Sequence, residues 1–208
     1  MRLRIDRRTG EVLLTVPKRA SRRHALEWAA THRAWVEKQL AAIEPRLRLL
    51  SGARLSLFGE PHEILWDERH RRVPNVEAGR IVIGGPPETL EGRLLRWLRR
   101  EARDLLSSES AEFAAKAGLR IVRISVGDPC SRWGSCSASG TIRYSWRLIL
   151  APSFVRRATI AHEVAHLAHM NHSGEFHALV ARLLGEDPKP ARLWLRRHGA
   201  QLHRIGSV

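Results

Sequence analysis

Five of the eleven histidines lie between residues 162 and 177, and two of them belong to the pattern His-Glu-x-x-His. Residues four apart on a helix share one face, so His162 and His166 can bind a single ion together. Imidazole suits Zn²⁺, and a catalytic zinc takes three protein ligands and keeps one position open for water. Glu163 lies beside the first histidine, where its carboxylate can take a proton from that water. The pattern therefore predicts metal-dependent hydrolytic chemistry with Glu163 as the base.

His172 is the candidate third ligand. It lies six residues after His166 and just beyond the expected helix end at Met170, so a turn would bring its ring back to the metal. Asn171 tolerates left-handed backbone conformations and is the residue that could make this turn. We expect His169 on the surface or behind a ligand, because a fourth histidine would close the site.

The segment before the metal-binding helix is expected to bind substrate. Zinc peptidases commonly hold an extended peptide along an exposed strand edge, and residues 132–147 have the pattern of an irregular hairpin. Trp133 could form a wall of the site, while Tyr144 or Arg147 could stabilise developing negative charge. The alternative interpretation places Trp133 and Trp146 in the core.

The elements that must position these residues are a mixture of strands and helices. Residues 2–16 alternate as a hairpin does, residues 21–43 have helical spacing, and residues 53–85 read as short strands. Pro86-Pro87 opens a long helix that Gly118 ends. Strands over 120–126 and 141–150 follow, and then helices over 153–170, after Ser173 and over 190–198.

This order predicts an α+β fold in two parts. Residues 1–85 would form an N-terminal β-rich region with one helix, and residues 86–208 would form the domain that carries the chemistry. The boundary is placed where the short strands give way to the long helix.

Composition limits the environment and the partners. No run approaches the ~18 to 20 apolar residues of a membrane span, and the first residues lack the apolar region of a secretory signal. Two cysteines, Cys130 and Cys136, favour a reducing cytoplasm. The net charge of +15 could attract nucleic acid nonspecifically. Only four of the 36 basic residues are lysines, however, and an arginine bias of this kind can reflect genome composition.

Three blocks in the C-terminal half resemble the YgjP-like metallopeptidase family, which is related to the WLM and SprT-like zinc proteins. They are SRWGSCSASGTIRYSWRLILAP, IAHEVAHLAHMNHSGEFHAL and RLWLRRHG, and they span residues 131–199 in this order. The resemblance implies a minimal zincin fold with one Zn²⁺ bound by His162, His166 and His172, and with Glu163 as catalytic base. Another divalent metal is the alternative to zinc.

Three functions stay open at this point. The first is a zinc metallopeptidase that acts on a peptide or protein. The second is a metal-dependent nucleoside triphosphate (UTP) pyrophosphatase, an activity attached to some family members, in which Arg132, Arg143 and Arg147 would bind phosphates. The third is a nucleic-acid-associated protein, which only the basic net charge supports. The metallopeptidase is favoured, because the sequence has no glycine-rich phosphate loop and no recognisable nucleic-acid module.

Overall fold

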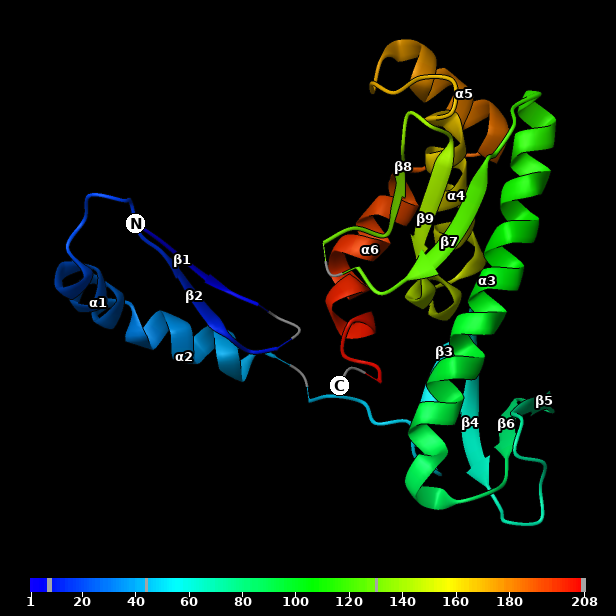
Figure 1. Ribbon diagram of the computed structural model, residues 1–208, viewed down its shortest axis with the longest axis horizontal. Helices are drawn as coiled ribbons and strands as arrows, with labels where there is room; N and C mark the ends of the chain where they lie inside the picture. The colour runs from blue at the N-terminus through cyan, green and yellow to red at the C-terminus, as the bar shows by residue number, and fades with distance from the viewer. Residues whose placement is uncertain (7–8, 44, 130, 207–208) are drawn as a thin grey trace. The chain divides into compact units, whose positions relative to one another are not determined.

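The structure, a computed structural model, describes residues 1–6, 9–43, 45–129 and 131–206 (Figure 1). They form two compact units, Met1–Arg46 and Leu47–Gly206. The mixture of strands and helices confirms the predicted α+β fold. The boundary expected near residue 86 lies inside the larger unit, and it stays a prediction about which segments fold on their own.

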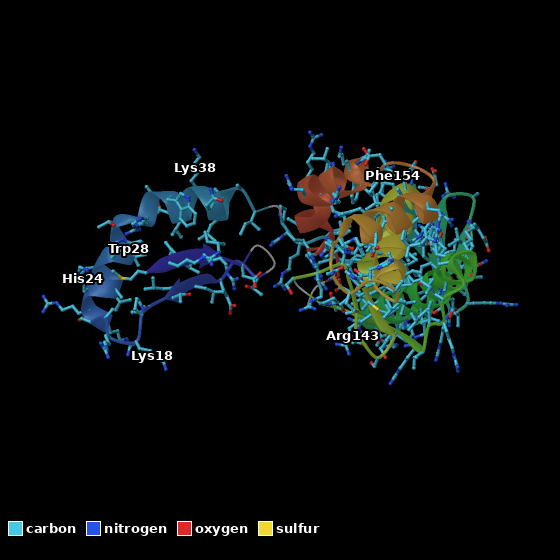
Figure 2. The ribbon with its side chains drawn as sticks, turned by 90° about the horizontal axis from the view of Figure 1, so that it is seen from above. Lys18, His24, Trp28, Lys38, Arg143 and Phe154 are labelled. Carbon is cyan, nitrogen blue, oxygen red and sulfur yellow. The ribbon has the colours of Figure 1, made fainter. Side chains whose placement is uncertain are left out.

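The smaller unit pairs a hairpin with two helices. β1 (Arg2–Ile5) and β2 (Val12–Thr15) are antiparallel, and α1 (Arg22–Thr31) and α2 (Arg33–Ala41) follow them. Figure 2 shows Lys18, His24 and Lys38 projecting from this unit. Their exposure fits a basic surface, while nucleic-acid binding by that surface stays a prediction.

The single helix expected over residues 21–43 is divided at His32. The carbonyl of Trp28 accepts a hydrogen bond from the Thr31 hydroxyl (2.7 Å) and lies 3.0 Å from Nδ1 of His32. Side chains that bond locally to the backbone in this way compete with the helical ladder. Hydrophobic spacing continues across the break, so periodicity alone could not show it.

The larger unit begins with a four-stranded sheet in the order β3-β4-β6-β5. Its strands are β3 (Arg54–Leu57), β4 (Glu60–Trp66), β5 (Asn75–Glu77) and β6 (Arg80–Ile83). β4 and β6 are parallel, whereas the other pairs are antiparallel. The buried side chains of this sheet join the core of the larger unit.

A short 3-10 turn, η1 (Pro87–Thr89), leads into the long helix α3 (Leu90–Ala117). The predicted start at the prolines and end at Gly118 are both confirmed, and Gly118 takes the left-handed conformation (φ 67°) that commonly closes a helix. Figure 1 shows α3 running beside both sheets of this unit. Its buried face therefore connects the strands before it with the elements after it.

The second sheet has the order β7-β9-β8, with β7 (Arg123–Gly127), β8 (Gly134–Cys136) and β9 (Thr141–Ser145). β8 lies at an edge and pairs antiparallel with β9, as the expected hairpin requires. The strand predicted to reach Leu150 instead ends at Ser145. There the Ser145 side chain accepts the backbone N–H of Arg147, and the 3-10 turn η2 (Trp146–Leu150) begins.

Three helices complete the larger unit, α4 (Ser153–Ala165), α5 (Gly174–Leu184) and α6 (Lys189–Leu202). None of the helices in the described ranges combines the length and the apolar character needed to cross a bilayer. Of the two cysteines, Cys136 has a free thiol in β8 and Cys130 lies outside the described residues.

Candidate metal centre

α4 carries the His-Glu-x-x-His pattern at its C-terminal end. α4 is buried on most of its surface, with Val155, Ile160 and Val164 in the core, so the helix is anchored by packing. It ends at Ala165 rather than near Met170, the end predicted from the sequence.

The chain leaves α4 through a tightened last turn. The N–H groups of Leu167 and Ala168 donate to carbonyls three residues earlier, at 3.0 and 3.1 Å. Asn171 does not supply the left-handed turn that was considered, because none of residues 166–172 has a positive φ. The earlier end of the helix gives the chain enough residues to turn back without one.

Three histidine side chains converge after this turn. One ring nitrogen from each of His162, His166 and His172 lies within 4.8 Å of the other two. Nε2 of His172 is 3.3 Å from Nε2 of His162. Two imidazole nitrogens that bind the same ion can lie at this separation.

The surroundings of His162 and His166 favour the neutral imidazole, which is the form that binds a metal. Burial, followed by the neighbouring histidines, lowers the pKa of His162 to about 4, and burial also lowers the pKa of His166. Nδ1 of His166 lies 3.0 Å from the backbone carbonyl of His169. A proton on Nδ1 would donate to that carbonyl and leave Nε2 free as a ligand. A set of three imidazole ligands fits a borderline ion such as Zn²⁺.

Phe176 holds the three rings in place, and the sequence reasoning did not single it out. Its fully buried ring packs against His162, His166 and His172, with centroid separations of 4.9, 4.6 and 4.7 Å. The side chain of Ser173 caps α5 by accepting the N–H of Phe176. An aromatic residue just after the third histidine was the available signal.

Glu163 is only 5% exposed and lies against β8. A Cβ atom on Gly134 would lie 2.5 Å from Oε1 of Glu163, so only glycine leaves room for this carboxylate. Burial raises the pKa of Glu163 to about 7, an effect that the charge of Arg132 partly opposes. No described residue donates a hydrogen bond to its oxygens. A carboxylate in this state can take up and release a proton near neutral pH.

A cavity of about 230 Å³ opens beside His162 and Glu163. Trp133 lines it, while its contact with substrate stays a prediction. The same ring packs on α6, because a Cβ on Gly199 would lie 2.8 Å from Cζ2 of Trp133. Trp133 therefore joins the strand edge to α6, and Trp146, by contrast, is fully buried in the core.

The structure does not bring Tyr144 or Arg147 to this cavity. Both are completely buried, and the Tyr144 hydroxyl lies 3.0 Å from Oγ of Ser110 on α3. Arg147 donates to the carbonyls of Leu202 (2.8 Å) and Ile205 (3.1 Å) and pairs with Asp128. Their predicted contacts with substrate stay predictions that this placement does not favour.

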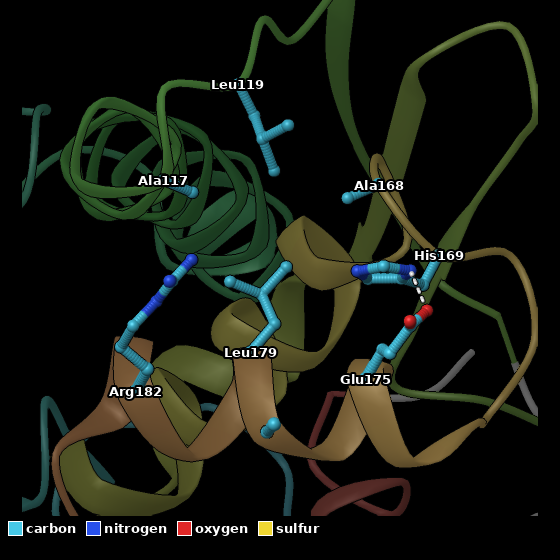
Figure 3. A pocket seen from close by; sticks show the side chains of 8 residues that line it. Ala117, Leu119, Ala168, His169, Glu175, Leu179 and Arg182 are labelled. Carbon is cyan, nitrogen blue, oxygen red and sulfur yellow. Dashed lines mark ion pairs between the residues drawn. The ribbon is translucent and has the colours of Figure 1, made fainter.

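His169 lies outside the cluster, in a second cavity of about 390 Å³. Figure 3 shows its ring beside Glu175, with Nδ1 3.6 Å from a carboxylate oxygen, and with Leu119 and Leu179 farther along the cavity. Its side chain thus faces away from the three converging rings while its carbonyl supports His166. This is the position behind a ligand that the sequence suggested.

Comparison with known proteins gives one match. A model of the YgjP-like metallopeptidase domain matches residues 1–198 of the 208-residue chain. No curated protein and no solved structure shows significant similarity to it. The match includes the three converging histidines, Glu163 and the hairpin that ends in Trp146. The chain therefore belongs to the YgjP-like family of metallopeptidase domains.

Proposed function

We propose that this protein is a zinc-dependent peptidase whose metal is held by His162, His166 and His172, with Glu163 as the base. The observation that carries the proposal is the convergence of three ring nitrogens within 4.8 Å beside a buried carboxylate that has no described partner. Membership of a metallopeptidase family supports it, since that family implies a metal ion and a peptide substrate.

The residues of the chain divide the chemistry between them. A Zn²⁺ ion bound by three imidazoles supplies a Lewis acid that lowers the pKa of a bound water to about 7. Glu163 accepts a proton from the attacking water at a carboxylate oxygen and returns it to the leaving amine. The burial that raises the pKa of Glu163 to about 7 suits both transfers. Phe176 fixes the imidazole orientations throughout.

The edge of β8 is the proposed place for the peptide backbone. β8 pairs with β9 along one side only, among the strands that the structure describes. The other side can pair with an extended peptide, as strand edges do in other peptide-binding proteins. Gly134 lies on this strand against Glu163, so a peptide paired there would run past the proposed base.

The pyrophosphatase alternative has less support. Arg147, one of the three arginines expected to bind phosphates, has its guanidinium engaged by Asp128 and by backbone carbonyls. Arg132 and Arg143 are exposed, but exposure alone favours no particular anion.

Metal removal tests the proposal. We expect the purified protein to cleave an unfolded protein or a fluorogenic peptide library, to lose this activity with a chelator, and to regain it with one equivalent of Zn²⁺. His166→Ala should lose both metal and activity, whereas the exposed His70→Ala should retain both. Cleavage that persists without metal would contradict the proposal. Pyrophosphate release from UTP that disappears in Glu163→Gln would favour the nucleotide alternative instead.

A further inference from the structure

The cavity beside His162 and Glu163 has a lining that favours an apolar ligand group. Its walls come from α4, α5, α6 and the start of β8, where Trp133 and Gly134 lie. The helices contribute mostly apolar side chains: Ala158, Phe176, Val180, Ala191 and Leu195. Its volume of about 230 Å³ lies below the roughly 300 Å³ at which pockets for drug-sized ligands begin. A space of this size and lining suits one apolar side chain.

Arg192 brings a permanent positive charge to this apolar space. It lies in the first turn of α6, lines the cavity and is exposed. No residue of the described ranges forms an ion pair or hydrogen bond with its guanidinium. Arg147 and Arg156, by contrast, are buried against Asp128 and Glu109. An arginine free of partners at the rim of a cavity can offer its planar donors to a ligand.

The acidic residues nearby leave this charge available. Among the described residues, Glu163 is the only acidic one that lines the cavity. Glu186 and Asp187 precede α6 and are exposed, and Asp187 accepts the backbone N–H of Lys189 at 2.9 Å. The N-terminal end of a helix also favours negative charge, so the start of α6 adds to the preference of Arg192.

We propose that the cavity binds an apolar side chain of the substrate while Arg192 binds a carboxylate that lies next to that side chain. The inference rests on the peptidase function proposed above and names its substrate class. The carboxylate is either the C-terminus of the peptide or the side chain of the next residue, because both present the same pair of oxygens to a guanidinium. A carboxylate fits better than a phosphate, since Arg192 is the only arginine or lysine lining the cavity in the part of the chain that the structure describes.

Binding without turnover tests this recognition in the zinc-loaded Glu163→Gln protein. The probes are N-acetyl-leucine, N-acetyl-leucinamide and N-acetyl-Leu-Asp-amide. Calorimetry measures the affinity of each probe. We expect at least one of the two carboxylates to bind about tenfold more tightly than leucinamide. Arg192→Gln should reduce that advantage to about twofold or less, while Arg197→Gln, an exposed arginine of the same helix outside the cavity, should retain it.

The outcomes separate the two sources of carboxylate and the two proposals. An advantage for N-acetyl-leucine alone identifies the C-terminus, and an advantage for the Leu-Asp probe alone identifies an acidic side chain. An advantage that survives Arg192→Gln would mean that the carboxylate binds the metal, and it would overturn the role of Arg192. Equal binding of all three probes would overturn it as well.

Cleavage kinetics complete the test. For wild type we expect kcat/KM to favour peptides that carry the preferred carboxylate, and Arg192→Glu should shift the preference toward a Leu-Lys pair. If wild type cleaves no peptide at all, the peptidase function fails while the binding result for Arg192 still stands. If neutral and acidic peptides are cleaved equally, the peptidase function survives and the specificity inference fails.

Discussion

Two glutamates are buried where α3 and α4 lie, Glu109 on α3 and Glu163 on α4. One has a positively charged partner and the other has none among the described residues. Glu109 on α3 is 9% exposed and accepts two hydrogen bonds from Arg156, at 2.8 and 3.0 Å. Glu163 on α4 is 5% exposed and receives none from any described residue. Burial raises the pKa of Glu163 to about 7, whereas Glu109 forms an ion pair with Arg156.

The difference shows how one helix can serve two purposes. A buried carboxylate with a bidentate arginine fixes the position of α4 against α3. A buried carboxylate without a partner is costly for folding, because its charge loses hydration without compensation. The same cost makes it ready to accept a proton. Arg156 thus fixes the position of α4, whereas Glu163 on the same helix stays available to accept a proton.

The largest expected effect comes from removing the reactive carboxylate. Glu163→Gln should lower kcat by about 10²- to 10⁴-fold, because proton transfer by a positioned side chain contributes that much. Bound zinc should stay stoichiometric by metal analysis, since no proposed ligand changes. Glu175→Gln is the matched control, because Glu175 is exposed and lies beside His169. A kcat of Glu163→Gln within tenfold of the wild-type value would contradict the proposed difference between Glu163 and Glu109.

Removing the paired carboxylate should instead affect stability. Glu109→Ala leaves Arg156, which is 5% exposed, buried without its counter-charge, and breaking a buried pair costs about 3 to 5 kcal/mol of unfolding free energy. Urea denaturation measures this loss. The double variant Glu109→Leu with Arg156→Met should regain most of it, because neither charge is then buried alone.

A more exposed ion pair between α3 and α4, formed by Glu112 and Arg157, allows a comparison with the stability loss at the buried pair. Arg157 bonds both oxygens of Glu112 at 3.1 and 2.9 Å, yet both side chains are partly exposed. Glu112→Gln should therefore cost no more than about 1 kcal/mol. Equal losses for Glu109→Ala and Glu112→Gln would show that burial of the pair is unimportant.

A smaller loss of activity is expected from crowding Glu163 without changing it. Gly134→Ala places a Cβ 2.5 Å from Oε1, so the carboxylate must move, and a misplacement of about 1 Å can cost about 10²-fold in rate. Gly127→Ala in β7 is the control, because nothing lies within 4 Å of its Cβ position. Unchanged kinetics in Gly134→Ala would mean that the position of Glu163 is not critical.

The smallest effect is a pH dependence of stability in the metal-free protein. The pKa of Glu163 is about 7 in the folded state and 4.5 ordinarily, so the native state binds more protons between these values. Its contribution to stability is fully present below about pH 4.5 and is lost as the pH rises through about 7. The Tm of Glu163→Gln relative to wild type should therefore increase from pH 4.5 to 7.

The contribution of His162 has the opposite sign. Its folded pKa of about 4 lies below the ordinary value of 6.5, so it favours folding as the pH rises between them. Both proteins retain His162, and comparing them isolates Glu163. A Tm difference that stays constant with pH would contradict the unpaired burial of Glu163.

The convergence of the three histidines was predictable because helix geometry fixes which residues share a face. His162 and His166 needed only their spacing, and His172 needed only a turn between it and the helix. The environment of Glu163 was not predictable in this way, since it depends on Gly134, which the sheet brings from a distant part of the chain. Spacing identifies a candidate base but not what surrounds it.

The substrate residues show the same limit in a different form. Tyr144 was expected at the substrate site, and the spacing of residues along β9 could not show that α3 covers Tyr144 through Ser110. Arg147 lay within the strand predicted over residues 141–150, whereas it belongs to the 3-10 turn η2 and donates to the carbonyl of Leu202. Residues far along the chain decided both positions.

The attachment of α6 to Arg147 and Trp133 has a consequence for biosynthesis. Ribosomes make the three converging histidines before they make Arg192, Gly199 and the carbonyl of Leu202, which form or anchor one wall of the cavity. Domains generally fold as units, and all of these residues belong to the larger unit. The cavity is therefore complete only after α6 has been made, and a message truncated before α6 yields a protein that lacks the wall carrying Arg192.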